Sequence, residues 1–314
     1  MPSIRSSACR LFVKNYLAPR FNAGKTIDAH RSALESLSKL RFLPPGTKTE
    51  PVSSDGLNAE WVSVGKVAEN KVILYLHGGA YTFGSSNTHR DIAARISKYS
   101  GFKVLVLNYR LAPEFPYPAA IEDATNAFRW LVRSGISPDG VAVAGDSAGG
   151  GLAIATVISL RDNGDPLPGS VVCFSPWIDL EGNGGSDMAN IANDPMLRPE
   201  WLDYMAACYA CGSDLRDPYI SPVHADLKGL PPILIQVGSD EILLGDSRRF
   251  SDNALTAGVE VKLDVWEKMW HVWHLFGGVM PEGARALKEA GGFIRKHCDR
   301  VPGADITCGA GRSA

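Results

Sequence analysis

The chain has 314 residues, of which 45% are hydrophobic and 21% are charged, and its formal net charge at pH 7 is -2. This composition is typical of a globular protein and provides no basic stripe for binding nucleic acid. No apolar run approaches the ~18 residues of a membrane span, so we expect a cytoplasmic protein without one. Six cysteines are too few for a disulfide framework in a chain of this length.

The N-terminal segment, residues 1–45, is expected to form a helical part of a cap. Its first 27 residues hold five basic side chains and no acidic one. The basic residues are Arg5, Arg10, Lys14, Arg20 and Lys25. Transit peptides share this charge balance, but a cationic amphipathic helix explains the same residues.

After residue 45, short apolar runs alternate with longer segments of helical pattern. The expected strands cover residues 71–79, 101–110, 140–147, 170–177, 231–241 and 259–268. The expected helices lie near residues 87–99, 118–134, 148–163, 245–257 and 283–298. Continuous apolar strands separated by helices predict an α/β fold, with a mostly parallel sheet of about eight strands and helices on both faces.

One segment interrupts this alternation. Residues 180–215 contain Gly, Asn and Pro breakers followed by a helical pattern from Trp201 to Cys211. An insertion between two strands of such a sheet is expected to form a cap over the carboxyl edge of the strands. We therefore expect a main domain over residues 46–300 that includes this insertion, followed by a tail over residues 301–314.

Ser147 is the candidate nucleophile. It lies in Gly145-Asp146-Ser147-Ala148-Gly149, which matches G-x-S-x-G and stands between an apolar strand and a helical segment rich in Ala, Ile and Leu. A strand that turns into a helix within one residue strains the corner residue, and glycines on either side prevent clashes there. A glycine-rich turn with an incidental serine is the alternative interpretation.

A serine that attacks an acyl group also needs hydrogen-bond donors for the developing oxyanion. Gly78 and Gly79 follow the first expected parallel strand, and we predict that their N–H groups and that of Ala148 form this oxyanion hole. His77 is interpreted as a residue that braces the loop. Ala80 and Tyr81, which follow the glycines, are predicted to contact substrate.

The general base is expected downstream of the nucleophile. His271 and His274 follow the last expected strand, and His271 is favoured because it lies nearer the strand end. Trp266, Trp270 and Trp273 surround both histidines and indicate a limited acyl pocket, and Trp270 is predicted to contact substrate. Partly buried imidazoles among the tryptophans are the alternative.

Asp240 is the predicted acid that orients the histidine, because it directly follows an expected strand. Glu241 and Asp246 are the alternatives. Glu241 would point away from the histidine if the strand geometry continued, and Asp246 is typical of a helix N-terminus.

Motifs for a nucleotide, a flavin or a metal are not evident. The stretch AGKT at residues 23–26 lacks the upstream glycine of a P-loop, and the Cys208/Cys211 pair has no second pair to complete a zinc site. We expect neither a cofactor nor a metal.

Taken together, these motifs make the chain similar to the bacterial hormone-sensitive lipase family of α/β-hydrolase esterases. They are His77-Gly78-Gly79, GDSAGG at residues 145–150, Asp240 and Met269-x-His271, in this order, and YRLAPEFPYPAAIED at residues 109–123 resembles a further family signature. The resemblance implies an α/β-hydrolase fold, a catalytic domain over residues 46–300 and a cap made from the N-terminal helices and the 180–215 insertion. Many members have a third glycine at the position of Ala80.

The resemblance also implies a carboxylesterase with a Ser-His-Asp acyl-enzyme mechanism. The three tryptophans around His271 favour esters with short to medium acyl chains. An amidase or lactonase using the same triad is an alternative, as is a receptor-like module that binds a small molecule. The expected partner is a small-molecule ester, and a homodimer is compatible with the sequence.

Overall fold

A single mixed sheet organises the molecule. The structure, a computed structural model, describes residues 2–39, 42–54, 56–182 and 190–298. Within these residues, eight strands pair in the order β1-β2-β4-β3-β5-β6-β7-β8. They are β1 (Thr47–Ser54), β2 (Leu57–Val64), β3 (Val72–Leu76), β4 (Lys103–Leu107), β5 (Val141–Asp146), β6 (Ser170–Phe174), β7 (Ile233–Gly238) and β8 (Val261–Trp266). The predicted mostly parallel sheet of about eight strands is confirmed.

The sheet is parallel from β4 through β8, whereas β1 and β2 form an antiparallel hairpin at its edge. The sequence indicated the six parallel strands, β3 to β8, but not this hairpin. The reason is that β1 is mostly exposed and contains Pro51, so it has neither a continuous apolar run nor a full set of backbone donors. Edge strands tolerate both features.

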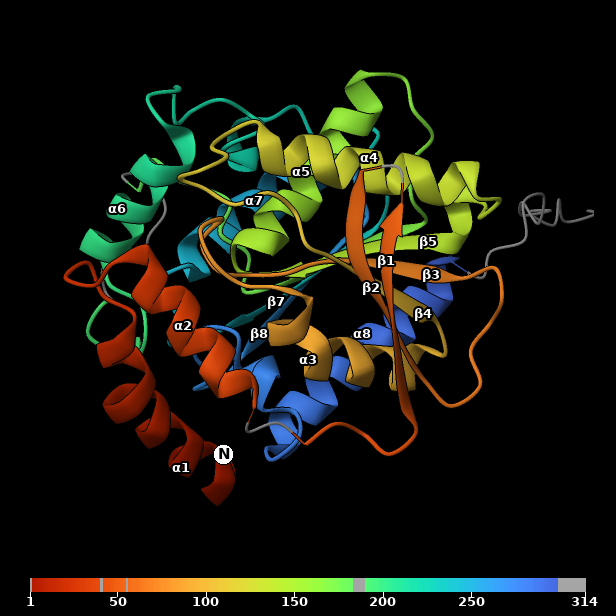
Figure 1. Cartoon of the computed structure of the whole chain (residues 1–314). Helices are drawn as coiled ribbons and strands as arrows, with labels where there is room; N and C mark the ends of the chain where they lie inside the picture. The colour runs from red at the N-terminus through yellow and green to blue at the C-terminus, as the bar shows by residue number, and fades with distance from the viewer. Residues whose placement is uncertain (1, 40–41, 55, 183–189, 299–314) are drawn as a thin grey trace, which may run out of the picture.

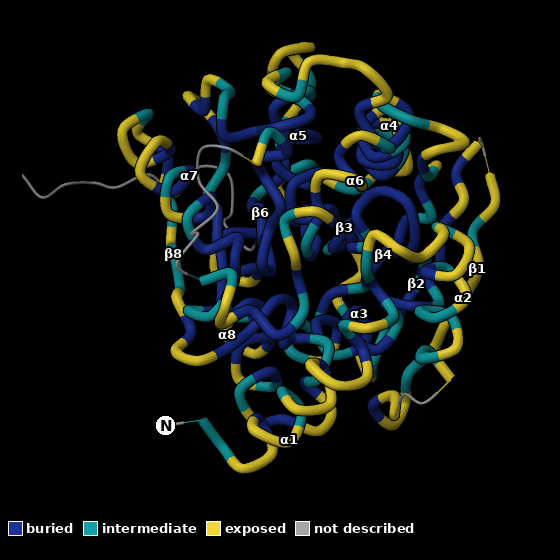
Figure 2. Tube along the Cα trace, turned by 90° about the vertical axis from the view of Figure 1, so that its left-hand side faces the viewer, coloured by how far each residue is buried: buried dark blue, intermediate teal, exposed yellow. Residues whose placement is uncertain are grey.

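Helices cover both faces of the sheet (Figure 1). They are α1 (Ile4–Phe12), α2 (Ile27–Ser38), α3 (Ser86–Ser100), α4 (Ala119–Arg133), α5 (Ala148–Asp162), α6 (Pro199–Ala210), α7 (Leu244–Thr256) and α8 (Pro281–Cys298). On one face, α3 and α8 pack over the sheet, while α4, α5 and α7 contribute to the core on the other. Successive strand residues alternate between these cores, since Leu74 belongs to one and Tyr75 to the other. Figure 2 shows the buried strands at the centre.

The helices α1, α2 and α6 lie together at one end of the sheet (Figure 1). Two short helical turns, η1 (Val13–Leu17) and η2 (Ala18–Arg20), continue α1. Helices are therefore present in the N-terminal segment and in the second half of the 180–215 insertion, as expected. Residues 183–189 of that insertion and the predicted tail 301–314 lie outside the described residues. Among the described residues, no helix combines the length and apolar character needed to cross a bilayer.

Candidate active site

Ser147 occupies a strained corner between β5 and α5. Its backbone has φ 53° and ψ -124°, a region that L-residues rarely adopt. The flanking glycines give this corner room: a Cβ on Gly145 would lie 2.2 Å from the Gly149 carbonyl oxygen, and one on Gly149 would lie 2.1 Å from the Leu76 carbonyl oxygen. The glycines are thus a steric requirement of the turn, which holds Ser147 above the carboxyl edge of the sheet.

The structure brings His271 to Ser147. His271 lies in the loop after β8, is 4% exposed, and its Nε2 atom is 2.9 Å from Ser147 Oγ. His274 is turned away, with its Nε2 atom 3.2 Å from Gln236 Oε1 and its ring against Trp273. Burial lowers the pKa of His274 to about 3, so this imidazole is neutral at ordinary pH.

Glu241, and not the predicted Asp240, contacts His271. Glu241 Oε2 lies 3.2 Å from His271 Nδ1, whereas the Asp240 carboxylate pairs with Arg10 at 2.8 Å. The prediction was wrong because it extended strand alternation past Gly238, where β7 ends. The chain turns there, the Asp240 N–H donates to the Met269 carbonyl, and Glu241 points inward. The third candidate, Asp246, lies in α7 and does not contact the histidine in the described structure.

Ser175 holds the Glu241 carboxylate in place, and sequence reasoning did not identify it. Its hydroxyl donates to Glu241 Oε1 at 2.6 Å and accepts the Val272 N–H at 3.0 Å. The Gly238 N–H also donates to Oε1, at 2.6 Å. Burial raises the pKa of Glu241, and the hydrogen bonds from His271, Ser175 and Gly238 oppose that rise. The available signal was the position of Ser175 directly after the central strand β6.

Gly78 was predicted to donate its N–H group to the oxyanion, and the structure contradicts this. The Gly78 N–H donates to Asp146 Oδ1 at 3.1 Å, so it is not free to bind an oxyanion. Asp146 draws this N–H inward because it is a buried carboxylate that also accepts the Tyr75 hydroxyl, at 2.7 Å. In contrast, Gly79 and Ala80 line the cavity beside Ser147.

Three backbone donors remain available near Ser147. They are the N–H groups of Gly79, Ala80 and Ala148, none of which donates to another residue in the described part of the chain. Gly79 and Ala80 adopt positive φ values of 119° and 50°. Ala148 is the first residue of α5, where N–H groups have no partner within the helix.

His77 supports the loop of residues 77–80, which was predicted to supply the oxyanion donors. Its Nδ1 atom lies 2.9 Å from the Gly78 carbonyl oxygen, and its ring stacks on Tyr109 with centroids 4.3 Å apart. The Tyr109 hydroxyl donates to the His77 carbonyl at 2.7 Å. Burial and the neighbouring His89 lower the pKa of His77 to about 3, and a neutral ring with these contacts agrees with the expected bracing role.

An apolar cavity of about 320 Å³ adjoins Ser147 and His271. Its walls come mainly from the N-terminal helical segment, residues 196–201 at the start of α6 and the loop before α8. They include Leu17, Phe21, Leu34, Met196, Trp201 and Phe276. Of the three residues expected to contact substrate, Ala80 lines the cavity, whereas Tyr81 and Trp270 do not. Tyr81 stacks on Tyr209 with centroids 3.7 Å apart, and Trp270 is fully buried in a separate core cluster, so both are packing residues.

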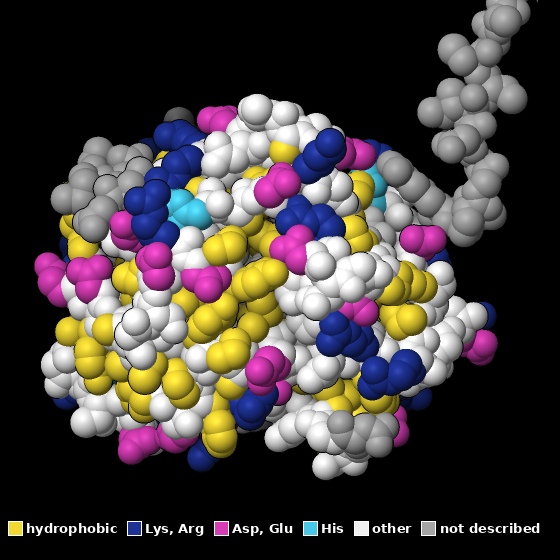
Figure 3. Space-filling view, turned by 90° about the horizontal axis from the view of Figure 1, so that it is seen from above, with side chains coloured by type: hydrophobic (Ala, Val, Ile, Leu, Met, Phe, Trp, Pro, Cys, Tyr) yellow, Lys and Arg dark blue, Asp and Glu magenta, His cyan; other side chains and the backbone are white. Residues whose placement is uncertain are grey.

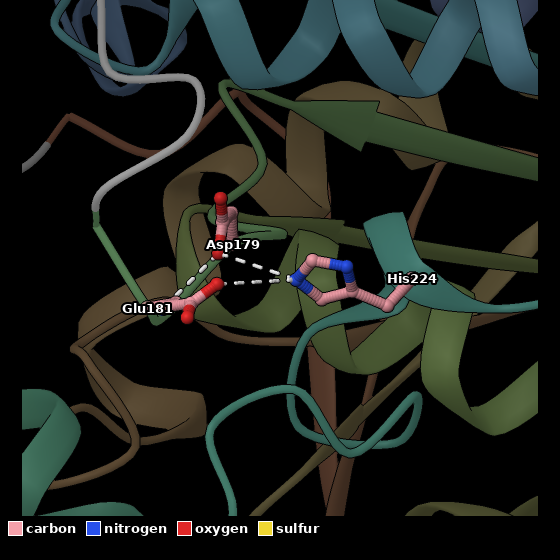
Figure 4. Close-up of side chains that lie close together, drawn as sticks. All are labelled: Asp179, Glu181 and His224. Carbon is pink, nitrogen blue, oxygen red and sulfur yellow. Dashed lines mark hydrogen bonds and ion pairs between the residues drawn. The ribbon is translucent and has the colours of Figure 1, made fainter.

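A second group of polar side chains lies away from Ser147, near the end of β6. His224 Nε2 is 3.9 Å from Asp179 Oδ1 and 3.8 Å from Glu181 Oε2 (Figure 4). Their potential ligand atoms lie within 4.8 Å of one another, a spacing that could admit a metal ion. Arg249, however, pairs with the other Asp179 oxygen and already supplies positive charge there. We assign no metal to this group.

The chain is similar to known hydrolases and esterases. A family model described as the alpha/beta hydrolase fold matches residues 73–275. An acetyl-hydrolase of Streptomyces hygroscopicus is 45% identical over 267 residues, which are 85% of this chain and 88% of that protein. An esterase of Acinetobacter venetianus is 34% identical over 268 residues, or 85% and 88% of the two chains. A crystal structure of an esterase from the bacterial hormone-sensitive lipase (HSL) family has a TM-score of 0.91 at 41% identity, covering 95% of this chain and 99% of that chain.

Proposed function

The chain belongs to the bacterial hormone-sensitive lipase family of α/β hydrolases, and from that membership we propose that it is a carboxylesterase with Ser147 as its nucleophile. The observation that carries the proposal is the 2.9 Å contact between Ser147 Oγ and His271 Nε2 beside an apolar cavity. The buried Glu241 carboxylate on the far side of the imidazole completes the arrangement of nucleophile, base and orienting acid.

The reaction proceeds in two acyl-transfer steps. His271 Nε2 takes the Ser147 proton as Oγ attacks the ester carbonyl, and Glu241 stabilises the imidazolium through the Nδ1–H. The same imidazolium then protonates the departing alcohol, which leaves an acyl group on Ser147. A water molecule, deprotonated by His271, attacks this acyl group, and the carboxylic acid departs as Ser147 recovers its proton.

The oxyanion hole consists of the N–H groups of Gly79, Ala80 and Ala148. All three lack another acceptor in the described structure, and the first two belong to the cavity wall. Gly78 instead fixes the loop through Asp146, the residue that precedes the nucleophile. Its bond to Asp146 ties the donor loop to the nucleophile turn, so the donors are in place before charge develops.

The substrates are small-molecule esters with short to medium acyl chains. At about 320 Å³, the cavity lies near the lower end of the ~300–1,000 Å³ range of ligand pockets, and its walls are mostly apolar. We propose that residues 1–45 and the 180–215 insertion form the cap and that residues 46–300 form the catalytic domain, because Leu17, Leu34 and Trp201 cover the site. The cytoplasmic location and the homodimer stay predictions.

The test is hydrolysis of p-nitrophenyl esters from acetate to palmitate by wild type, Ser147→Ala and Ser159→Ala. Ser159 also lies on α5 but away from the cavity, so it controls for the substitution itself. We expect rates to be highest for butyrate to octanoate and low for palmitate. Ser147→Ala should lose activity by about 10³-fold or more, and Ser159→Ala should keep it. Equal rates in the two variants, or no hydrolysis by wild type, would reject the proposal.

A further inference from the structure

The first helical segment carries an apolar stripe on the side that faces solvent. Ile4, Ala8 and Leu11 are spaced by four and three residues, which places them on one face of α1, and all three are exposed. Ile4 is 91% exposed and Leu11 is 60% exposed. On the other side, Cys9 of α1 and Val13 and Leu17 of the following turn η1 pack on a core cluster that contains Trp266, Trp270 and Trp273. The packing of α1 on the protein therefore does not account for the outer stripe, since a core-facing helix ordinarily buries its apolar face.

This stripe continues into the mouth of the active-site cavity. Phe12, the last residue of α1, is 40% exposed and also lines the cavity. Phe42 and Val279 likewise line the cavity and are partly exposed, at 80% and 47%. The Arg5 guanidinium reaches the Val279 carbonyl, which places α1 beside this rim. Apolar side chains thus extend from the outer face of α1 to the cavity that holds Ser147.

The helical segment that carries the stripe has basic but no acidic side chains. At 100° per residue, Arg5 lies to one side of the Ile4–Leu11 face, and Lys14 follows in η1. The first acidic residue in the chain is Asp28. Arg10 pairs with Asp240, but Arg5, Lys14 and Lys25 form no ion pair in the described part of the chain. Elsewhere the surface is mixed: the face in Figure 3 intersperses basic with acidic side chains. Two acidic side chains from elsewhere in the chain also adjoin α1: Glu282 accepts hydrogen bonds from Ser3, and Asp240 pairs with Arg10. The charged side chains of the helical segment itself are all basic.

We propose that this face docks on an anionic phospholipid surface, with Ile4, Leu11 and Phe12 inserted at the level of the headgroups. An exposed apolar stripe flanked by Lys and Arg is the pattern by which a helix lies in a membrane interface. The basic side chains contact anionic headgroups, an attraction that weakens with added salt. Docking brings the cavity mouth at Phe42 and Val279 against the lipid. Figure 2 shows α1 at the margin of the molecule.

The test is co-sedimentation with vesicles, using full-length protein with Ser147→Ala so that binding is measured without turnover. One set of vesicles is phosphatidylcholine and the other is an equimolar mixture with phosphatidylglycerol. Leu11→Glu and Lys14→Glu probe the stripe and its charge. Leu255→Glu and Lys228→Glu are the matched controls, because Leu255 is 55% exposed on α7 and Lys228 is exposed on a distant loop. Thermal melting checks that all variants fold.

We expect the protein to bind the anionic vesicles more tightly than phosphatidylcholine and to be released by added salt. Leu11→Glu and Lys14→Glu should each weaken binding by about tenfold or more, and the two controls should not. Equal binding to both kinds of vesicle, or equal loss in the controls, would overturn the proposal. It would also be overturned if sedimentation velocity without lipid showed a dimer that Leu11→Glu dissociates, since a second copy would then cover the stripe. None of these readouts depends on ester hydrolysis.

Discussion

Glu241 Oε2 lies 3.2 Å from His271 Nδ1, so the acid behind the imidazole is a buried glutamate with an aspartate as its immediate neighbour. Asp240 instead forms a partly exposed ion pair with Arg10, which contributes ~1 kcal/mol or less to stability. The two adjacent carboxylates thus have different environments. Substituting each in turn should distinguish the residue that orients the histidine from the residue that forms a surface ion pair.

Glu241→Gln is expected to lower kcat by about 10³- to 10⁴-fold, because an amide cannot stabilise the imidazolium and favours the wrong tautomer. Asp240→Asn is the matched control and should retain activity within a few fold. The measurement is kcat and KM on p-nitrophenyl butyrate, with melting temperatures to confirm folding. A larger loss for Asp240→Asn would contradict the assignment of Glu241.

Ser175→Ala is expected to shift the acid limb of the rate profile. Its hydrogen bond lowers the pKa of Glu241 against the upward effect of burial, so its removal raises that pKa further. The carboxylate is then protonated at a higher pH, and activity should be lost at a higher pH than in wild type. Because Ser175 positions Glu241 and does not contact substrate, kcat should fall about tenfold with little change in KM.

The control for Ser175 is Ser239→Ala. The Ser239 hydroxyl donates to Asp240 Oδ1 and accepts the Lys268 N–H, so it supports the same loop without contacting Glu241. Profiles of kcat/KM against pH would be compared for the three proteins. An acid limb that stays at its wild-type position in Ser175→Ala would show that the hydroxyl does not tune the carboxylate.

The two histidines after β8 should respond differently to substitution. His271→Gln removes the group 2.9 Å from Ser147 Oγ and is expected to reduce kcat by about 10³-fold or more. His274→Gln should leave kcat within about tenfold of wild type but lower the free energy of unfolding by ~1–3 kcal/mol, because that ring is buried and hydrogen-bonded to Gln236. Rates would be measured well below the melting temperatures, and the reverse order of losses would exchange the two roles.

Asp246 links stability to pH through burial. Desolvation, together with the charge of Asp179, raises its pKa to about 8, and Arg249 only partly opposes this. In the unfolded chain the carboxyl titrates near ~3.9. The folded protein therefore retains a proton that the unfolded chain releases, and the stability from this group is lost as pH rises from ~4 to about 8.

Asp246→Asn removes this titration and should be more stable than wild type above the raised pKa. The difference in free energy of unfolding is expected to be a few kcal/mol larger at about pH 9 than at about pH 5, at about 1.4 kcal/mol per pKa unit. Urea melts at the two pH values measure it. Asp252→Asn, an exposed position on the same helix, should show no such difference. If the difference in free energy of unfolding between Asp246→Asn and wild type were the same at both pH values, Asp246 would have an ordinary pKa.

Much of the fold was predictable from local patterns. The inner strands and their helices are long apolar or amphipathic runs, and the Ser147 turn is marked by glycines at short, fixed spacing. The β1–β2 hairpin was not recognised because an exposed edge strand leaves no apolar run to detect. Ser175 was missed for a related reason: its partners Glu241 and Val272 are 66 and 97 residues away in sequence.

The sequence by itself determined the α/β architecture, the glycine-flanked turn at Ser147 and the histidine-bearing loop after the last strand, because these depend on residues close together in the chain. Only the tertiary structure decided which of two adjacent carboxylates meets His271, and which backbone donors remain free once Gly78 is bound to Asp146. The physical reason is that β7 ends at Gly238 and the following turn sets side-chain direction through contacts with distant residues. The tertiary structure also decided which side of α1 faces solvent, because the other side packs on the core.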